Sequence, residues 1–117
     1  MAVLGLLYLN GGKLNGRQIV PENWVSNSIV NHSTDSTGTW GDLQNEGYGY
    51  LWWLGKIENY TVFMALGWGG QYVLCIPYLN MIVVTTANPD VSWSEGDAHM
   101  SSVLTLIVDY ILPAVKV

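Results

Sequence analysis

The sequence predicts an α+β fold in which an antiparallel sheet of about four strands is packed by N-terminal and C-terminal helices. Four runs dense in β-branched and aromatic residues stand between residues 48 and 88, separated by short breaks. Short breaks favour an antiparallel meander. Runs with helical spacing precede and follow the strands, and the length of 117 residues suits a single domain, 1–117.

The opening stretch "MAVLGLLYLN" predicts a buried helix, because its apolar residues leave no polar stripe. These are Val3, Leu4, Leu6, Leu7 and Leu9. Gly11 supplies a left-handed C-terminal stop. No basic residue precedes Lys13, and about nine apolar positions are too few to span a bilayer, so we expect neither a signal peptide nor a transmembrane segment here.

Two turn signals, Gly11-Gly12 and Asn15-Gly16, predict a small hairpin or connector after this helix. Pro21 then stands at the first position of a short second helix, "PENWVSNSIV", which places Trp24, Val25, Ser28 and Ile29 on one side. Residues 31–47 are polar, rich in turn formers and without a period of 2 or 3.6. This composition predicts a long surface loop.

The four strand runs are "YGYLWWL", "YTVFMAL", "QYVLCIP" and "NMIVVTTAN". The final stretch predicts a helix that a capping box of Ser94 and Asp97 starts and Pro113 ends. Its helical spacing places six apolar residues on one face. They are Met100, Val103, Leu104, Ile107, Tyr110 and Ile111.

Charge and composition narrow the partners of the chain. The net charge of −5 argues against nucleic acid, which requires clustered Lys and Arg. Charged residues make up 11% of the chain against about 25% in ordinary soluble domains. We therefore expect a homo-oligomer, or a larger body that covers the apolar faces. The single cysteine, Cys75, is expected to be a small core side chain.

The usual catalytic and metal-binding patterns are missing from the sequence. No serine has a lysine three positions later, and neither a Gly-x-Ser-x-Gly elbow nor a phosphate-binding loop occurs. His32 and His99 have no Cys or acid at the spacing of metal ligands beyond what chance gives. We expect no metal and no cofactor.

The stretch "ALGWGGQ", residues 65–71, remains as a candidate site and has two interpretations. In the first, a glycine-rich bulge or loop joins two strands and Trp68 is a hydrophobic lid. In the second, the strand edge lacks side chains so that a substrate carbonyl can approach the backbone, where a free N–H stabilises an oxyanion. The chemistry of the residues alone leaves both open.

Three blocks of the sequence, in this order, resemble the C-terminal part of the serine hydrolases related to class C β-lactamases, penicillin-binding DD-peptidases and carboxylesterases. The blocks are "MAVLGLLYLNGGKLNGRQIVPENWV", "GYGYLWWL" and "ALGWGGQYVLCIPYLNMIVVTTANP", which cover nearly the whole chain. The resemblance implies a β-lactamase-like fold. It also implies hydrolysis of an ester or amide through an acyl-enzyme.

The same resemblance assigns roles to the candidate residues. Ala65, Leu66 and Gly67 occupy the place of the family's Lys-Thr-Gly or His-x-Gly motif, and Trp68 offers the backbone N–H of the oxyanion hole. The substrate-binding segment continues through Gly69, Gly70 and Gln71. Ala65 in place of Lys or His is similar to the sub-branch that hydrolyses amides and esters other than β-lactams.

The family's Ser-x-x-Lys nucleophile and catalytic tyrosine motif belong to the part of the fold that precedes this segment, and these 117 residues do not contain them. The resemblance therefore implies a C-terminal fragment that is inactive alone. A small-molecule ester or amide would be its substrate only after the N-terminal part completes the fold. By resemblance the enzyme would be bacterial, in the envelope, periplasmic or secreted. The alternative is a stand-alone non-catalytic domain for self-association or ligand binding.

Overall fold

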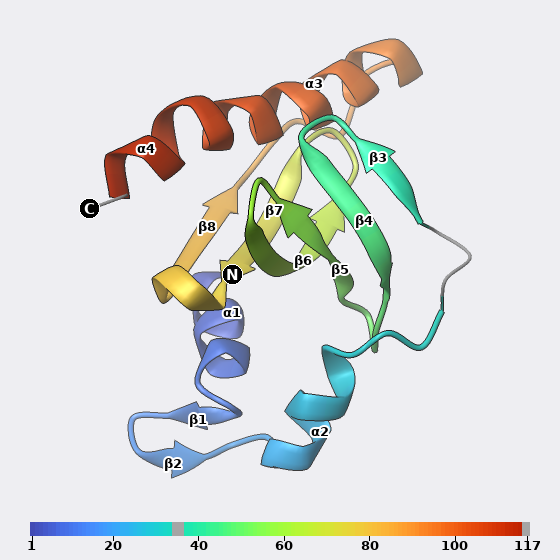
Figure 1. The fold of residues 1–117 in the computed structure, drawn as a ribbon. Coiled ribbons are helices and arrows are strands. Elements are labelled where there is room, and N and C mark those ends of the chain that lie inside the picture. Colours follow the sequence, from blue (N-terminus) through green and yellow to red (C-terminus); the bar gives the residue numbers. More distant parts are fainter. Residues whose placement is uncertain (34–36, 116–117) are drawn as a thin grey trace.

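The computed structural model describes residues 1–33 and 37–115 (Figure 1). The helical elements are α1 (Ala2–Leu9), α2 (Glu22–Ser28), the 3-10 helix η1 (Pro77–Leu79), α3 (Trp93–Leu106), the π-helix η2 (Ile107–Ile111) and α4 (Leu112–Val115). The strands are β1 (Lys13–Leu14), β2 (Arg17–Gln18), β3 (Gly38–Trp40), β4 (Leu43–Tyr48), β5 (Trp53–Ile57), β6 (Tyr60–Gly67), β7 (Gln71–Ile76) and β8 (Met81–Thr85).

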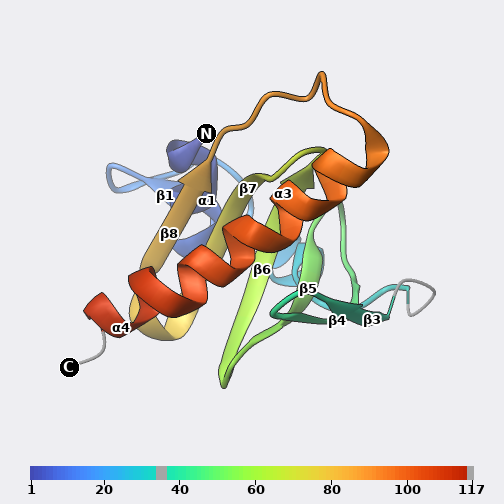
Figure 2. The ribbon, with the colours of Figure 1, turned by 90° about the horizontal axis from the view of Figure 1, so that it is seen from above.

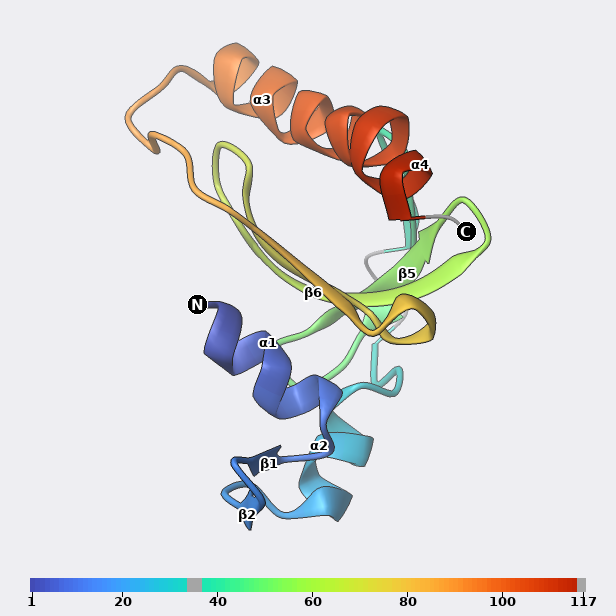
Figure 3. The same ribbon diagram turned by 90° about the vertical axis from the view of Figure 1, so that its left-hand side faces the viewer.

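The main sheet has six antiparallel strands in the order β3-β4-β5-β6-β7-β8, and β1 and β2 form a separate hairpin. Each strand of the main sheet pairs with its neighbour in the chain, so the predicted meander is confirmed. α3 to α4 cross one face of the sheet and α1 lies against the other (Figures 2 and 3). The α+β class is therefore confirmed, with two more strands in the main sheet than expected.

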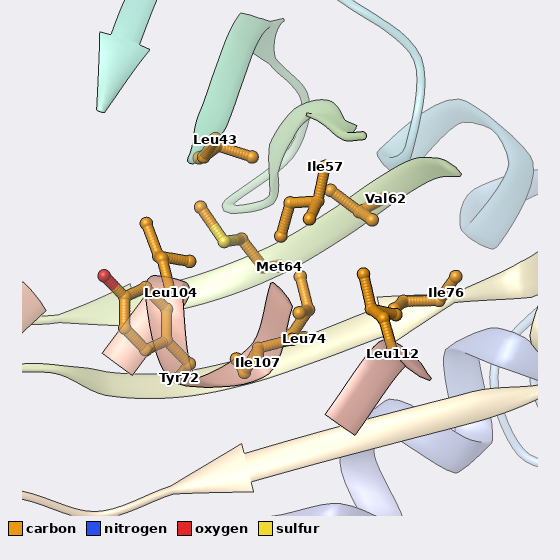
Figure 4. Packing of buried hydrophobic residues seen from close by; sticks show 10 residues of the cluster. All are labelled: Leu43, Ile57, Val62, Met64, Tyr72, Leu74, Ile76, Leu104, Ile107 and Leu112. Atoms are coloured by element: carbon orange, nitrogen blue, oxygen red, sulfur yellow. The ribbon is translucent and has the colours of Figure 1, made fainter. Parts of the chain in front are cut away.

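Alternation along β6 and β7 builds a core on each face of the sheet. Met64 and Leu74 belong to the cluster under α3 to α4, whereas Phe63 and Cys75 belong to the cluster under α1. The first cluster contains ten buried residues, drawn in Figure 4: Leu43, Ile57, Val62, Met64, Tyr72, Leu74, Ile76, Leu104, Ile107 and Leu112. Cys75 is fully buried, which confirms its expected place in the core.

The prediction of a surface loop over residues 31–47 is wrong where the structure describes them, because β3 and most of β4 lie in this stretch; residues 34–36 are outside the described part. In β4 the buried positions include Asn45 and Gly47 beside Leu43, with exposed polar residues between them. A strand whose inward positions are partly polar shows no apolar alternation.

The hairpin predicted from Asn15-Gly16 is confirmed, since β1 and β2 form there.

The run "YGYLWWL" is not one strand. β4 ends at Tyr48, a turn follows in which the Gly49 N–H donates to the Trp52 carbonyl, and β5 begins at Trp53. Leu51 takes a left-handed conformation, with φ of 65°, inside that turn. Aromatic density therefore predicted a strand where the backbone reverses direction.

The expectation that α1 is covered on several faces is also wrong. Its one buried residue is Gly5, which lies against β7 and β8, while Val3, Leu4 and Leu6 are exposed. The stop at its end is as expected, since Gly11 has φ of 64° just beyond the helix. The second helix begins one residue later than expected, at Glu22, and its Trp24 is exposed rather than packed.

The C-terminal helix starts and ends differently from the prediction. Its capping box is Ser92 with Glu95, not Ser94 with Asp97, and the helix continues through Pro113 to Val115. Pro113 lacks an N–H and crowds the preceding turn of an ordinary helix, and the π-helical turn η2 directly before α4 accommodates it. Tyr110, expected on the packed face, is exposed.

Residues Trp93–Val115 form the one helix of the described chain that is long and apolar enough to cross a membrane. Length and composition alone make this weak evidence, because core helices also pass such a test. In this structure Leu104, Ile107 and Leu112 of that helix are buried against the sheet (Figure 4). The share of its apolar stretch that is buried is 17%, so the helix packs on the sheet along one side only.

Candidate functional site

The stretch 65–71 forms the tip of the hairpin between β6 and β7. Ala65 pairs with Val73, Leu66 with Tyr72, and Gly67 with Gln71, so Trp68, Gly69 and Gly70 make the turn. The seven residues singled out from the sequence therefore lie together at one end of the sheet. Gly69 and Gly70 are buried, and the other five are half-buried.

Two of the glycines are required by the backbone of this turn. Gly69 and Gly70 have φ of 85° and 104°, values that residues with a side chain rarely adopt. A Cβ at Gly69 would lie 3.0 Å from the Asn88 carbonyl oxygen, and one at Gly70 would lie 3.3 Å from the His99 carbonyl oxygen. Gly67 differs, since its φ is not left-handed and a Cβ there would meet the Cβ of Gln71 at 3.2 Å.

Side-chain hydrogen bonds fix the turn. The Gln71 Nε2 donates to the Trp68 carbonyl over 3.1 Å, and the Thr85 hydroxyl donates to the Gly70 carbonyl over 2.7 Å. The same Thr85 oxygen accepts from the Tyr72 N–H. The Trp68 N–H lies outside the strands, and within the described residues it donates to no turn or loop carbonyl. The N–H groups of Gly69 and Gly70 likewise donate to no turn or loop carbonyl among the described residues, so all three backbone donors of the turn stay outside its own hydrogen bonds.

The indole of Trp68 packs on the start of α3. It forms an edge-to-face pair with Trp93, with ring centroids 4.7 Å apart, and it lies directly against the backbone of Gly96, where any Cβ would collide with its ring. This arrangement agrees with the interpretation of Trp68 as a hydrophobic lid. The sequence analysis did not connect Trp93, Gly96 or Thr85 with the turn, because their contacts depend on tertiary structure.

Besides a hollow of about 210 Å³ lined by Trp68, Val91 and Trp93, two hollows border the hairpin tip. One, of about 210 Å³, is lined by Ala65, Gly67, Gln71, Val73 and the start of α1 at Met1. The other, of about 380 Å³, lies toward α3. Its lining includes Trp40, Leu66, Trp68, Tyr72, Asp97 and Ser101. Leu66 and Tyr72 line both hollows, and the second adds the rings of Trp40 and Trp68.

Burial raises the pKa of two side chains of β7, Tyr72 beside the turn and Cys75 farther along the strand. Desolvation raises the pKa of Tyr72 to about 12, and the Tyr72 hydroxyl donates to the Met100 carbonyl over 3.0 Å. Desolvation likewise raises the pKa of Cys75 to about 12, so its thiol stays protonated at neutral pH. Neither group is an activated nucleophile. Within residues 1–33 and 37–115, no group of three His, Cys, Asp or Glu is placed to hold a metal ion.

Comparison with protein-family models and with curated proteins gives no match to this chain. The likeness to serine hydrolases therefore depends on the three sequence blocks and on the site residues 65–71.

Proposed function

We propose that this chain is the C-terminal portion of a β-lactamase-related serine hydrolase and contributes the third-motif strand, β6, and one oxyanion-hole donor, the Trp68 N–H. In the complete enzyme a serine activated by lysine and tyrosine would attack an ester or amide carbonyl. The N–H would then stabilise the tetrahedral oxyanion. The nucleophile would come from sequence outside these 117 residues.

The observation that carries the proposal is the rigid turn of Trp68, Gly69 and Gly70, whose backbone N–H groups take no part in the turn's own hydrogen bonds, and the resemblance selects Trp68 among the three. An oxyanion donor is effective when it is held in place before the reaction, so that no reorganisation accompanies charge development. The bonds of Gln71 and Thr85 to the carbonyls of the turn provide that rigidity. One hollow is lined by Ala65 and Gly67 and another by Trp68, so there is room for a substrate at this end of the strand.

The test removes the N–H and keeps the indole. In the longer enzyme that contains this chain, indole-3-lactic acid is introduced at residue 68, which replaces the amide N–H by an ester oxygen. Loss of an oxyanion donor costs about 3 kcal/mol, so kcat for a p-nitrophenyl ester should fall about 100-fold or more. Trp68→Phe is the control, because it keeps the donor and changes only the ring.

Equal kcat for the ester-containing and native proteins would refute the role of the Trp68 N–H. The wider proposal fails if the reading frame upstream of this chain encodes no Ser-x-x-Lys. That sequence observation requires no protein and should come first.

A second candidate function, self-association as a non-catalytic domain, is favoured by the exposed apolar surface. Val3, Leu4 and Leu6 of α1 are exposed, and β8 is an edge strand without a charged residue. Natural proteins rarely leave such edges and patches open. Sedimentation of this chain alone would then show a concentration-dependent homo-oligomer at micromolar concentration. A single monomeric species would exclude this function.

A further inference from the structure

The hollow of about 380 Å³ between β3, the β6–β7 hairpin and α3 has the make-up of a small-molecule site. Its floor is buried, since Tyr72 and Leu104 are 1% and 2% exposed. Trp40, Leu66 and Trp68 form its walls and are half-buried. Ligand pockets of proteins have volumes of about 300–1,000 Å³ and combine apolar walls with a few polar groups that orient the ligand.

Contacts with other aromatic rings hold both indoles of the walls. Trp40 forms an edge-to-face pair with Trp53, with ring centroids 4.8 Å apart. Trp68 is held in the same way by Trp93, with centroids 4.7 Å apart. A ligand therefore meets walls that are already in place, which reduces the entropic cost of binding.

The turn between β3 and β4 is fastened to α3 at the border of the hollow. The Thr105 hydroxyl donates to the Asp42 carboxylate over 2.7 Å. Gly41 has φ of 56°, and a Cβ there would lie 3.4 Å from the Cα of Ser101. Because Gly41 and Ser101 both line the hollow, this contact fixes the distance between its sheet side and its helix side.

The polar groups at the hollow select a cation. Asp97 and Ser101 both line it and are four residues apart on α3, so their side chains lie on the same face of the helix. Among the described residues, neither side chain takes part in a hydrogen bond or an ion pair. The described lining residues include no Lys, Arg or His, so the Asp97 carboxylate is the charge that a ligand meets there.

We propose that this hollow binds a small primary amine, whose apolar body packs against Trp40 and Trp68 and whose ammonium group bonds to Asp97. The face of an indole attracts an ammonium group within about 6 Å of the ring, so the walls favour the same charge as the carboxylate does. The Ser101 hydroxyl adds a neutral acceptor one helical turn away. The net charge of −5 favours the approach of a cation and disfavours an anion of the same size.

The test compares 2-phenylethylamine with 2-phenylethanol, which has the same ring and arm but no charge, by ¹H–¹⁵N correlation spectra of the 117-residue chain. The amine should shift the amide signals of residues 39–41 and 97–101 in a saturable way, with a dissociation constant on the order of millimolar. The alcohol should bind about three- to ten-fold more weakly, because it forms neither an ion pair nor a cation–π contact.

Asp97→Asn isolates the charge, and Asp97 is exposed, so the fold does not depend on it. This variant should bind the amine about two- to five-fold more weakly and the alcohol as before. Asp109→Asn is the matched control. It removes the same charge from an exposed position of η2 that does not line the hollow, so it should leave both affinities unchanged.

Equal affinities of the native chain for the amine and the alcohol would overturn the proposal, because only apolar contact would then be at work. Unchanged affinity for the amine in Asp97→Asn would also overturn it, as would the absence of saturable shifts or their confinement to the exposed rings of Trp24 and Tyr50. None of these outcomes bears on the Trp68 N–H, which is tested through kcat in the longer enzyme.

Discussion

The contact between Trp68 and Gly96 makes a sharp stability prediction. In most exposed helix positions, replacing glycine by alanine stabilises the helix by about 1 kcal/mol. Gly96 lies in the first turns of α3, but the ring of Trp68 fills the space where its Cβ would be. We therefore expect Gly96→Ala to destabilise the protein despite the gain in helix propensity.

The size of the loss follows from what Trp68 must give up. Full burial of a large apolar side chain stabilises a protein by ~3 kcal/mol. Trp68 is half-buried, so moving the indole away loses about half of this free energy. It also loses the edge-to-face pair with Trp93, worth about 1 kcal/mol. Subtracting the helix-propensity gain of ~1 kcal/mol leaves a net loss of about 1.5 kcal/mol. For a chain of 117 residues this lowers Tm by roughly 6 °C.

Urea denaturation of a double-mutant cycle isolates the contact. In the Trp68→Ala background the ring is absent, so Gly96→Ala should become stabilising, by up to about 1 kcal/mol. The sign of the same substitution thus reverses between the two backgrounds. A stabilising Gly96→Ala in the presence of Trp68 would show that the indole does not occupy this position in solution, and the reasoning would be refuted.

Three further predictions concern the rest of the chain. Ser92→Ala removes the capping box of α3 and should lower the free energy of unfolding by about 1 kcal/mol. Bonds to Ser92 lower the pKa of Glu95, so the native protein loses stability as the pH falls and this carboxylate is protonated. In Ser92→Ala that loss of stability at low pH should be smaller. The buried Cys75 should react with Ellman's reagent at pH 8 only at the rate of unfolding, and immediate native-state reaction would contradict its burial. The chain alone should not hydrolyse p-nitrophenyl acetate or nitrocefin above a denatured control, and turnover blocked by a serine-reactive phosphonate would contradict the inactive-fragment proposal.

Local chemistry was sufficient to predict the meander and the small hairpin. β6, β7 and β8 are continuous apolar runs bounded by turn formers, and Asn15-Gly16 is a strong two-residue turn signal. β4 could not be predicted in the same way. Its inward positions include Asn45 and Gly47, which the fold buries through tertiary contacts that a sequence pattern does not record.

The helix ends show a related limit. Two capping boxes compete in "SWSEGD", and the sequence does not rank Ser92 with Glu95 above Ser94 with Asp97. The structure begins the helix at Trp93, directly after Ser92, which places Gly96 under the indole of Trp68. The start of α3 and the packing of the turn are thus coupled through the contact between Trp68 and Gly96, which are far apart in the chain.

The backbone geometry of the turn explains why the glycines of "ALGWGGQ" do not by themselves identify a catalytic site. Gly69 and Gly70 are needed by the turn whatever its function, since both have left-handed φ values and close backbone neighbours. A larger residue at either position would damage the fold and the activity together. Gly67 has no such backbone requirement, yet its Cβ would still press on Gln71, which fixes the turn. Under the proposed function, the atom that distinguishes an oxyanion hole from a purely structural turn is the Trp68 amide hydrogen, and a change confined to that atom tests the proposal.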